Sequence, residues 1–322
     1  MEGPIFWIGF FVFVLIMLAL DLFVFHKKNE VIKVKSALLW SLFWIGLALA
    51  FNTAIYFFLP ENNHQKALEF FTGYLIEESL SIDNLFVFIM IFGFFKIDPK
   101  YQHSVLFWGI IGAIVFRAIF IFAGVALIQK FAWIMYIFGA FLLYTGLKML
   151  IDRKEASEFN PNENIVIKTF RKFFPVSDDM SKPAFFIKKD GKTFATTFFV
   201  ALLFIEASDI IFAVDSIPAV LSVSTDVFIV YTSNIFAILG LRSLYFALSG
   251  IMPLFKYLKY ALAGILTFIG IKMCVNEFAS DCGYGFHISN FASLGVIITF
   301  LTVSILASVY NKKKESKEIK EN

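Results

Sequence analysis

The sequence contains nine apolar runs, each about long enough to cross a bilayer. In lipid a chain must satisfy its own backbone hydrogen bonds, so runs of this length are expected to be helices. Hydrophobic residues make up 59% of the 322 residues and charged residues only 16%, which excludes an ordinary soluble protein. We therefore predict an all-α polytopic membrane protein in which residues 1–322 form one membrane domain. The nine spans are expected near 5–25, 37–59, 68–95, 102–127, 131–150, 194–222, 227–249, 254–274 and 288–310.

Lysines and arginines gather in every second loop and predict the orientation of the chain. They follow the first, third, fifth and seventh spans and recur in the tail, whereas the alternate loops contain few. Because basic loops mark the cytoplasmic side, we expect the amino terminus outside and the carboxyl terminus inside an inner membrane. Residues 152–192 then form a cytoplasmic loop, either a plain solvated linker or one with a short helix or hairpin, and residues 311–322 form a cytoplasmic tail. No basic residue precedes the first apolar run, which argues against a cleaved signal peptide.

Matching motifs in distant spans predict an internal repeat. The matching pairs are 144–149 with 268–273, Arg117 with Arg242, Glu77 with Asp209, and 83–84 with 215–216. All of the pairs keep the same order, so 68–150 and 194–274 are predicted to be two copies of a three-helix unit. Because three is odd, the copies enter the membrane from opposite sides. Inverted repeats of this kind are common among secondary transporters, whose binding site lies near the bilayer midplane.

Seven acidic residues fall within the predicted spans and outnumber the arginines that could neutralise them. They are Asp21, Glu77, Glu78, Asp83, Glu206, Asp209 and Asp215. Arg117 and Arg242 lie deep in their spans, whereas Lys148 and Lys272 lie near span ends. We expect the two lysines to snorkel to the surface. If each arginine pairs with one acid, five acids remain (seven minus two), and crowded buried carboxylates either take up protons or bind cations.

A proline in the sixth span, Pro218, predicts a break in a helix that carries three of these acids. Proline has no backbone N–H, so the carbonyl near Val214 loses its helical partner. Asp209 and Asp215 lie about 120° apart on a regular helix, so a site that uses both needs unwinding, for which this proline offers a reason. The alternative is a kinked helix whose acids are neutralised by arginines on neighbouring helices.

The candidate ligands are hard oxygen donors, which suit Mg²⁺, Ca²⁺ or Mn²⁺. Asn84, Ser216 and Asn234 add neutral oxygens, although each is equally suited to a helix–helix hydrogen bond. The four histidines fall at span ends or in loops, which disfavours a histidine-rich zinc site. We expect no cofactor, no nucleic-acid partner and no enzymatic reaction. Cys274 and Cys282 both map to the outer side, where they either form a disulfide or remain two unrelated thiols.

Long strings in the spans resemble the TerC family of integral membrane proteins. The strings are 73–86 (GYLIEESLSIDNLF), 106–117, 209–219 (DIIFAVDSIPA) and 233–242 (SNIFAILGLR). The resemblance covers nearly all the spans and is closest to the Alx-like branch, whose members are often labelled membrane-bound redox modulators. It implies inverted three-helix repeats and, for several members, manganese(II) efflux; the family name comes from tellurium resistance, and one branch is associated with membrane-protein insertion. The site residues that it implies are Glu77, Asp83, Asn84, Asp209, Asp215 and Ser216.

The hypothesis from these features is a divalent-cation exporter, with Mn(II) as the expected ion, that works by alternating access of the two repeats. Asp83, Asp209 and Asp215 would bind the metal, and Glu77 or Glu206 would act as a further ligand or as a proton carrier. Proton exchange is a candidate for the coupling, because clustered acids shift one another's pKa. Besides the cation and a proton, the expected partner is the lipid bilayer.

Arg117 and Arg242 would pair with the vacated carboxylates when the site is empty. A rival of a different class is a stress-response or tellurium-resistance protein, or a membrane-protein assembly factor, that acts through protein contacts. That rival predicts that the loop 152–192 matters more than the buried acids. Redox modulation is a second rival, and it predicts a bound cofactor.

Overall fold

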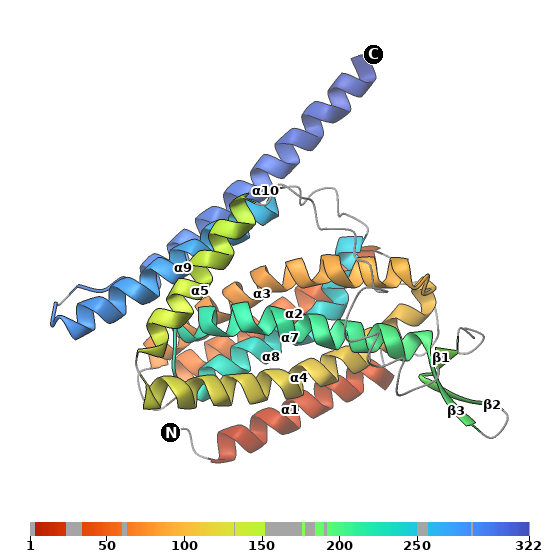
Figure 1. The fold of residues 1–322 in the computed structure, drawn as a ribbon, viewed down its shortest axis with the longest axis horizontal. Helices are drawn as coiled ribbons and strands as arrows, with labels where there is room; N and C mark the ends of the chain where they lie inside the picture. The colour runs from red at the N-terminus through yellow and green to blue at the C-terminus, as the bar shows by residue number, and fades with distance from the viewer. Residues whose placement is uncertain are drawn as a thin grey trace.

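A computed structural model describes residues 4–23, 34–59, 63–131, 133–151, 176–177, 184–189, 192–249, 257–284 and 286–321. Most of these residues are helical (Figure 1). The helices are α1 (Pro4–Phe23), α2 (Val34–Phe58), α3 (Asn63–Phe94), α4 (Pro99–Lys130), α5 (Ile134–Ile151), α7 (Thr197–Leu221), α8 (Val227–Ser249), α9 (Leu258–Asp281) and α10 (Asn290–Glu321). Each predicted span coincides with one of these helices, so the all-α polytopic fold is confirmed.

Seven of the described helices are long and apolar enough to span a membrane by length and composition. The other two are α1, whose apolar part Phe6–Leu20 is shorter, and α3, which is 32 residues long but rich in acids. Acids within a membrane must face protein or water rather than lipid. The polar side of α3 is therefore expected to point into the bundle.

Two helices, α9 and α10, differ in extent from the prediction. α9 begins and ends later than the expected span 254–274, because it runs from Leu258 to Asp281. α10 continues to Glu321, so the backbone of the predicted tail is helical over residues 311–321. The tail contains neither glycine nor proline, and its lysines and glutamates are good helix formers, which explains why the helix does not stop at the membrane boundary.

The described part of the predicted loop 152–192 belongs to a small β-sheet. Its strands are β1 (Val176–Ser177), β2 (Phe186–Lys189) and β3 (Lys192–Thr196), in the order β1-β3-β2. β2 and β3 are antiparallel, with Phe186 opposite Ala195, so the structure shows a hairpin in this loop. β3 leads directly into α7 and fixes where that helix begins (Figure 1). The rest of this loop lies outside the described residues.

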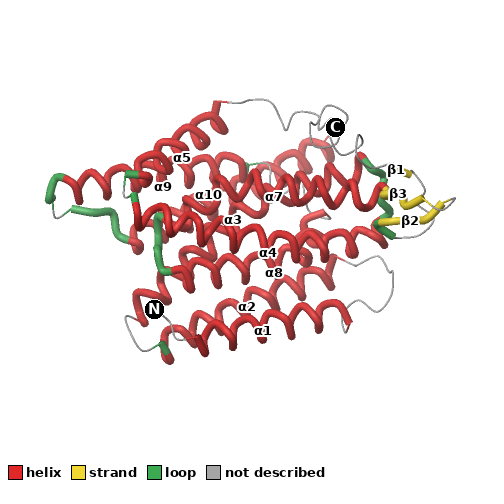
Figure 2. The backbone as a smooth tube through the Cα atoms, turned by 60° about the horizontal axis from the view of Figure 1, so that its bottom comes forward, coloured by secondary structure: helices red, strands yellow, loops and turns green. Residues whose placement is uncertain are grey.

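α8 is the central helix of the bundle. Every residue from Phe228 to Ser243 is buried, and the helix packs against α2, α3 and α4. Figure 2 shows it between α4 and α2. On another side α1 contributes ring contacts such as that of Trp7 with Phe228, whose centroids are 5.2 Å apart. Because α8 touches protein on all sides, it can carry polar residues away from lipid.

α5 and α9 pack side by side, and small residues set their close approach (Figures 1 and 2). A side chain added at Gly139 would lie 3.0 Å from the carbonyl oxygen of Gly270, and one at Gly146 would lie 2.8 Å from the carbonyl oxygen of Ala263. The backbones therefore touch, as glycines allow in membrane helices. Residue numbers rise along α5 as those of its contacts fall along α9, so the two helices are antiparallel.

The helix contacts follow the pattern that two related units require. α3 packs on α8 as α4 packs on α7, and each helix of the first unit also packs on its match in the second. α3 and α7 run in opposite directions, since Gly73 lies beside Val220 whereas the rings of Phe95 and Phe204 are 5.6 Å apart. These contacts favour the inverted repeat, which stays a prediction.

Candidate functional site

Four polar residues near the middle of four helices form a cluster in the centre of the bundle. They are Glu77 on α3, Arg117 on α4, Asp209 on α7 and Asn234 on α8. Each of the four is at most 2% exposed. Charged groups at this depth persist only when they are paired and hydrogen-bonded, so their contacts determine the chemistry of the cluster.

The guanidinium of Arg117 lies between two carboxylates. Its Nη2 donates to Oδ1 of Asp209 at 2.8 Å and its Nε donates to Oδ2 of Asp209 at 3.3 Å, a two-pronged contact. Its Nη1 forms an ion pair with Oε1 of Glu77 and donates to Oδ1 of Asn234 at 3.1 Å. One arginine therefore serves two acids, and these acids come from the two matching helices α3 and α7.

Glu77 is held by further donors. Nδ2 of Asn234 donates to its Oε2 at 2.8 Å, and the hydroxyl of Ser81 donates to its Oε1 at 3.2 Å. Asn234 thus bridges Arg117 and Glu77, which is the helix–helix hydrogen bond that the sequence left as one alternative. With both acids ionised the cluster carries two negative charges and one positive charge. It is an oxygen-rich site whose cation is supplied by the protein itself.

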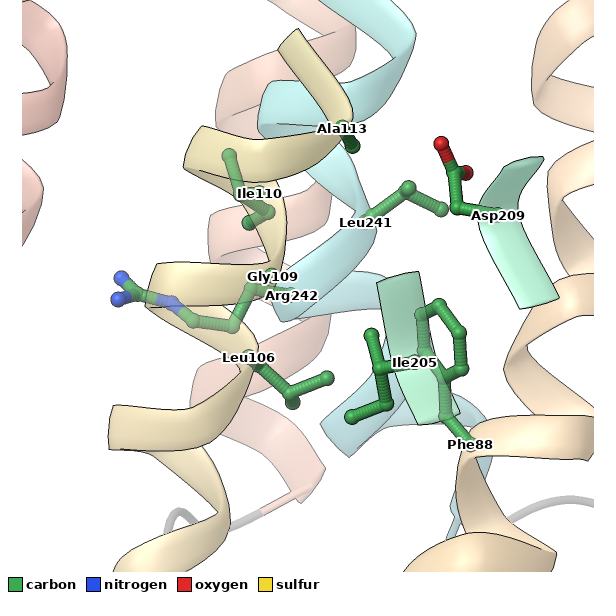
Figure 3. Close-up of a pocket in the computed structure, with 9 residues that line it drawn as sticks. All are labelled: Phe88, Leu106, Gly109, Ile110, Ala113, Ile205, Asp209, Leu241 and Arg242. Atoms are coloured by element: carbon green, nitrogen blue, oxygen red, sulfur yellow. The ribbon is translucent and has the colours of Figure 1, made fainter. Parts of the chain in front are cut away.

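A small cavity of about 20 Å³ lies beside Asp209, which is room for about one water molecule (Figure 3). Its walls are mostly apolar and come from α3, α4, α7 and α8. In Figure 3 the guanidinium of Arg242, which also lines the cavity, points away from Asp209. Nη1 of Arg242 lies 2.8 Å from Nε2 of His103 on α4. The described contacts of the two arginines therefore differ, although their places in the predicted repeats match.

The other predicted ligands lie outside the contacts of Arg117 described above. Asp215 accepts a hydrogen bond of 3.4 Å from the hydroxyl of Thr145 on α5. Oδ1 of Asn84 and Oγ of Ser216 are buried and have no hydrogen-bond partner among the described residues. Buried polar atoms are rarely left in this state, so these two oxygens have unused capacity for a ligand. The side chains of Asp83 and Asp21 lie outside the described part of the structure.

Two further acids each bury one oxygen without a partner. These oxygens are Oε2 of Glu78 on α3 and Oε2 of Glu206 on α7. The carboxylate of Glu206 fills the space that a side chain at Gly112 of α4 would take. Among the side chains that the structure describes, no three from histidine, cysteine, aspartate and glutamate are grouped so as to hold a metal. Of the predicted ligands that the structure describes, Glu77 and Asp209 meet at Arg117.

The predicted unwinding near Pro218 is wrong. α7 is a continuous helix from Thr197 to Leu221 and contains this proline in its last turns. Glu77 and Asp209 meet without a broken helix because they come from different helices and share Arg117. The proline lies close enough to the end of α7 that the missing hydrogen bond interrupts little of the helix.

Lys272 was expected to reach the surface, and this expectation is wrong. Its side chain is 2% exposed, and its Nζ donates to Oδ1 of Asn290 at 2.8 Å. The error follows from the extent of α9, which continues to Asp281 and leaves the lysine well inside the helix. Lys148, its match on α5, is exposed as predicted.

The two cysteines are not bridged. Both are free thiols, and Cys282 is exposed whereas Cys274 is half-buried. Cys274 lies within α9 and Cys282 directly follows it. Eight residues of helix separate their backbones by about 12 Å, which is beyond the reach of a disulfide.

The chain is similar to known membrane proteins along nearly its whole length. The profile described as the integral membrane protein TerC family matches residues 62–316. An uncharacterised membrane protein of Myxococcus xanthus is 47% identical over 97% of this chain and 94% of its own length. A protein of Salmonella typhi, named as a candidate membrane-bound redox modulator Alx, is 43% identical over 98% of both chains. An uncharacterised membrane protein of Rickettsia bellii is 43% identical over 95% of this chain and 97% of its own. No solved structure matches.

Proposed function

The chain belongs to the integral membrane protein TerC family, and from this premise we propose that it exports a divalent cation. The expected cargo is Mn(II), and the expected mechanism is alternating access of the two three-helix units. The alternative, a redox modulator, comes from the names of relatives such as the Salmonella protein. The buried cluster around Arg117 favours the cation.

The observation that carries this proposal is the position of the Arg117 guanidinium. It lies between the carboxylates of Glu77 and Asp209, which are donated by matching helices of the two units. A divalent cation in the same place would neutralise both carboxylates, whereas the single guanidinium leaves one negative charge. Arg117 therefore stands in for the cargo when the site is empty, and arrival of the cation releases it.

The remaining ligands would be recruited from the same two helices. Asp83 and Asp215 follow Glu77 and Asp209 at the same spacing, and Asn84 and Ser216 come next in the chain. The partnerless oxygens of Asn84 and Ser216 are hard donors of the kind that Mn(II) accepts. Glu206 is set against Gly112, and we leave it out of the ligand set.

The expected direction of transport follows from the basic loops. They predict an amino terminus outside and a carboxyl terminus inside the inner membrane, so that export carries the cation from the end where α3 ends to the end where α3 begins. α3 and α7 cross in opposite directions, which is the relation that lets one site open first to one side and then to the other.

Uptake into proteoliposomes tests the proposal with Mn²⁺, Mg²⁺, Ca²⁺ and Zn²⁺ compared in parallel. We expect Mn²⁺ uptake by the wild type and a loss of at least about tenfold in Glu77→Gln and Asp209→Asn, because each removes one of the two charges that face the cation. Glu277→Gln is the matched control, since it removes an acid near the end of α9, and it should transport normally.

Cells that lack their own exporter provide the second test. Asp209→Asn and Asp83→Asn should fail to lower cellular manganese. Wild-type export by both variants would contradict the proposal. If the same variants kept their function while deletion of 152–175 abolished it, the alternative of a protein that acts through contacts with other membrane proteins would be favoured.

A further inference from the structure

The two ends of the helix bundle differ: among the described residues, one end has a hollow and the other is joined by hydrogen bonds. We propose that Lys272 is the latch of a gate at the end where α3 begins, and that the cation leaves through this gate when the latch opens. This inference rests on the proposed export function. It adds the residues that keep the site closed on one side.

The latch is a chain of hydrogen bonds across three elements. Nζ of Lys272 on α9 donates to Oδ1 of Asn290 at 2.8 Å, and Nδ2 of Asn290 donates to the carbonyl oxygen of Val223 at 3.0 Å. Asn290 is the first residue of α10, and Val223 lies in the turn between α7 and α8. Burying an ammonium costs free energy unless it is hydrogen-bonded, so Lys272 stays buried only while these elements remain together.

A second layer of contacts ties the same turn to the beginning of α3. The hydroxyl of Ser224 donates to Oε2 of Glu69 at 2.6 Å, and Nζ of Lys66 lies 3.1 Å from Oδ2 of Asp226. Polar side chains thus close this end of the bundle where α3, the α7–α8 turn, α9 and α10 meet.

The opposite end of the bundle is hollow. A hollow of about 790 Å³ lies where α3 ends, α4 begins and α8 ends. Polar groups of Lys96, Asp98, Gln102 and Tyr245 contribute to its lining. Among the described residues, the bundle thus has a hollow at one end and hydrogen bonds across the other, an asymmetry of the kind that alternating access requires.

A comparison with the matching lysine of the first unit supports the role of Lys272 as a latch. Lys148 holds the place in α5 that Lys272 holds in α9, because both follow glycine by two residues and precede methionine. Lys148 is exposed, with its Nζ 5.7 Å from the ring centre of Tyr144. One lysine is buried and its counterpart lies outside the core, so an exchange of conformations between the two units would release Lys272.

Thiol labelling in nanodiscs measures the latch directly. The reporter is Val223→Cys, a buried position whose backbone carbonyl is kept, in a chain that also carries Cys274→Ser and Cys282→Ser. A water-soluble maleimide should label it slowly. We expect Lys272→Met and Asn290→Leu each to raise the labelling rate about tenfold, since each removes a hydrogen bond of the latch. Lys148→Met, the same change at the exposed counterpart, should leave the rate unchanged.

Mn²⁺ uptake by the same proteins separates the two proposals. If the wild type transports Mn²⁺ but neither latch variant labels faster, the gate is overturned and the export function stands. If the wild type transports none of the divalent cations, export fails and the gate fails with it. Thermal melting shows whether each variant folds. If Lys272→Met does not fold, the labelling rate of Asn290→Leu, which changes a neutral residue, decides whether the latch exists. If Lys148→Met labelled as fast as the latch variants, the assignment of Lys272 as the latch would be overturned.

Discussion

At the scale of single residues, one arginine in the centre of this protein forms ion pairs with two acids. Counting charges suggests one acid for each arginine, but Arg117 contacts Glu77, Asp209 and Asn234 at once. A planar guanidinium has five N–H donors, so it can bind several oxygens in a way that a lysine cannot. Nη1 of the second arginine, Arg242, lies 2.8 Å from Nε2 of His103. Among the described side chains, two carboxylates therefore share the single positive charge of Arg117.

Replacement of Arg117 by methionine should destabilise the empty protein and make it depend on metal. Two buried carboxylates lose their positive partner, and breaking a buried pair lowers the free energy of unfolding by about 3–5 kcal/mol. A cation that binds in place of the guanidinium restores part of the lost stability. The gain is about 2.7 kcal/mol when the cation concentration is a hundred times its dissociation constant. Thermal melting with and without Mn²⁺ measures both effects.

The exposed lysine variant Lys148→Met is the control for that experiment, and it should melt like the wild type with or without Mn²⁺. The expected pattern is a larger Mn²⁺-induced rise of the melting temperature in Arg117→Met than in the wild type. An equal rise in the two proteins would mean that the cation does not use the place of the guanidinium.

At the scale of helices, close backbone contact holds the two units together. α5 and α9 approach through Gly139, Gly146 and Gly270, where an added Cβ would meet backbone atoms of the partner helix at 2.7–3.0 Å. Backbone atoms cannot move aside as a flexible side chain can. The two helices thus form a fixed pair.

Gly270→Ala should therefore weaken the α5–α9 pair. Its new methyl group would lie 2.7 Å from the carbonyl oxygen of Gly139 and 2.8 Å from the backbone nitrogen of Leu143. Overpacking of this kind typically lowers stability by about 1–3 kcal/mol. Unfolding in detergent, followed by circular dichroism, measures the loss.

Gly295→Ala is a matched control on α10, since nothing lies within 4 Å of the added methyl group. In this variant the better helix propensity of alanine should leave stability unchanged or raise it by up to about 1 kcal/mol. If both glycine variants behaved alike, the close approach of α5 and α9 would not be what limits packing.

At the scale of the whole molecule, the chain is asymmetric about its centre. Among the described residues, one end has the hollow and the small β-sheet (Figure 1), and the other is tied by hydrogen bonds of Lys272, Asn290 and Glu69. The distribution of basic residues predicts that the hollow end faces the cytoplasm. The exposed thiol of Cys282, directly after α9, is then expected on the outer side.

Orientation can be tested with this native cysteine. In intact cells that express the protein, a membrane-impermeant maleimide should label the wild type and Cys274→Ser, but not Cys282→Ser. The half-buried Cys274 should react little, so removal of Cys282 should abolish most of the signal. Labelling that requires permeabilised cells would mean that the chain crosses the membrane in the reverse orientation.

The sequence by itself determined the all-α class, the approximate position of the helices and the presence of acids within them, because these depend on bilayer thickness and on the unfavourable burial of charge. The tertiary structure alone decided which acids meet. Glu77 and Asp209 are 132 positions apart in the chain and share Arg117 only through the packing of α3, α4 and α7. Lys272 was misplaced for a related reason: a hydrophobicity pattern marks where a span is apolar, but the neighbours of a side chain decide whether it reaches water or stays buried.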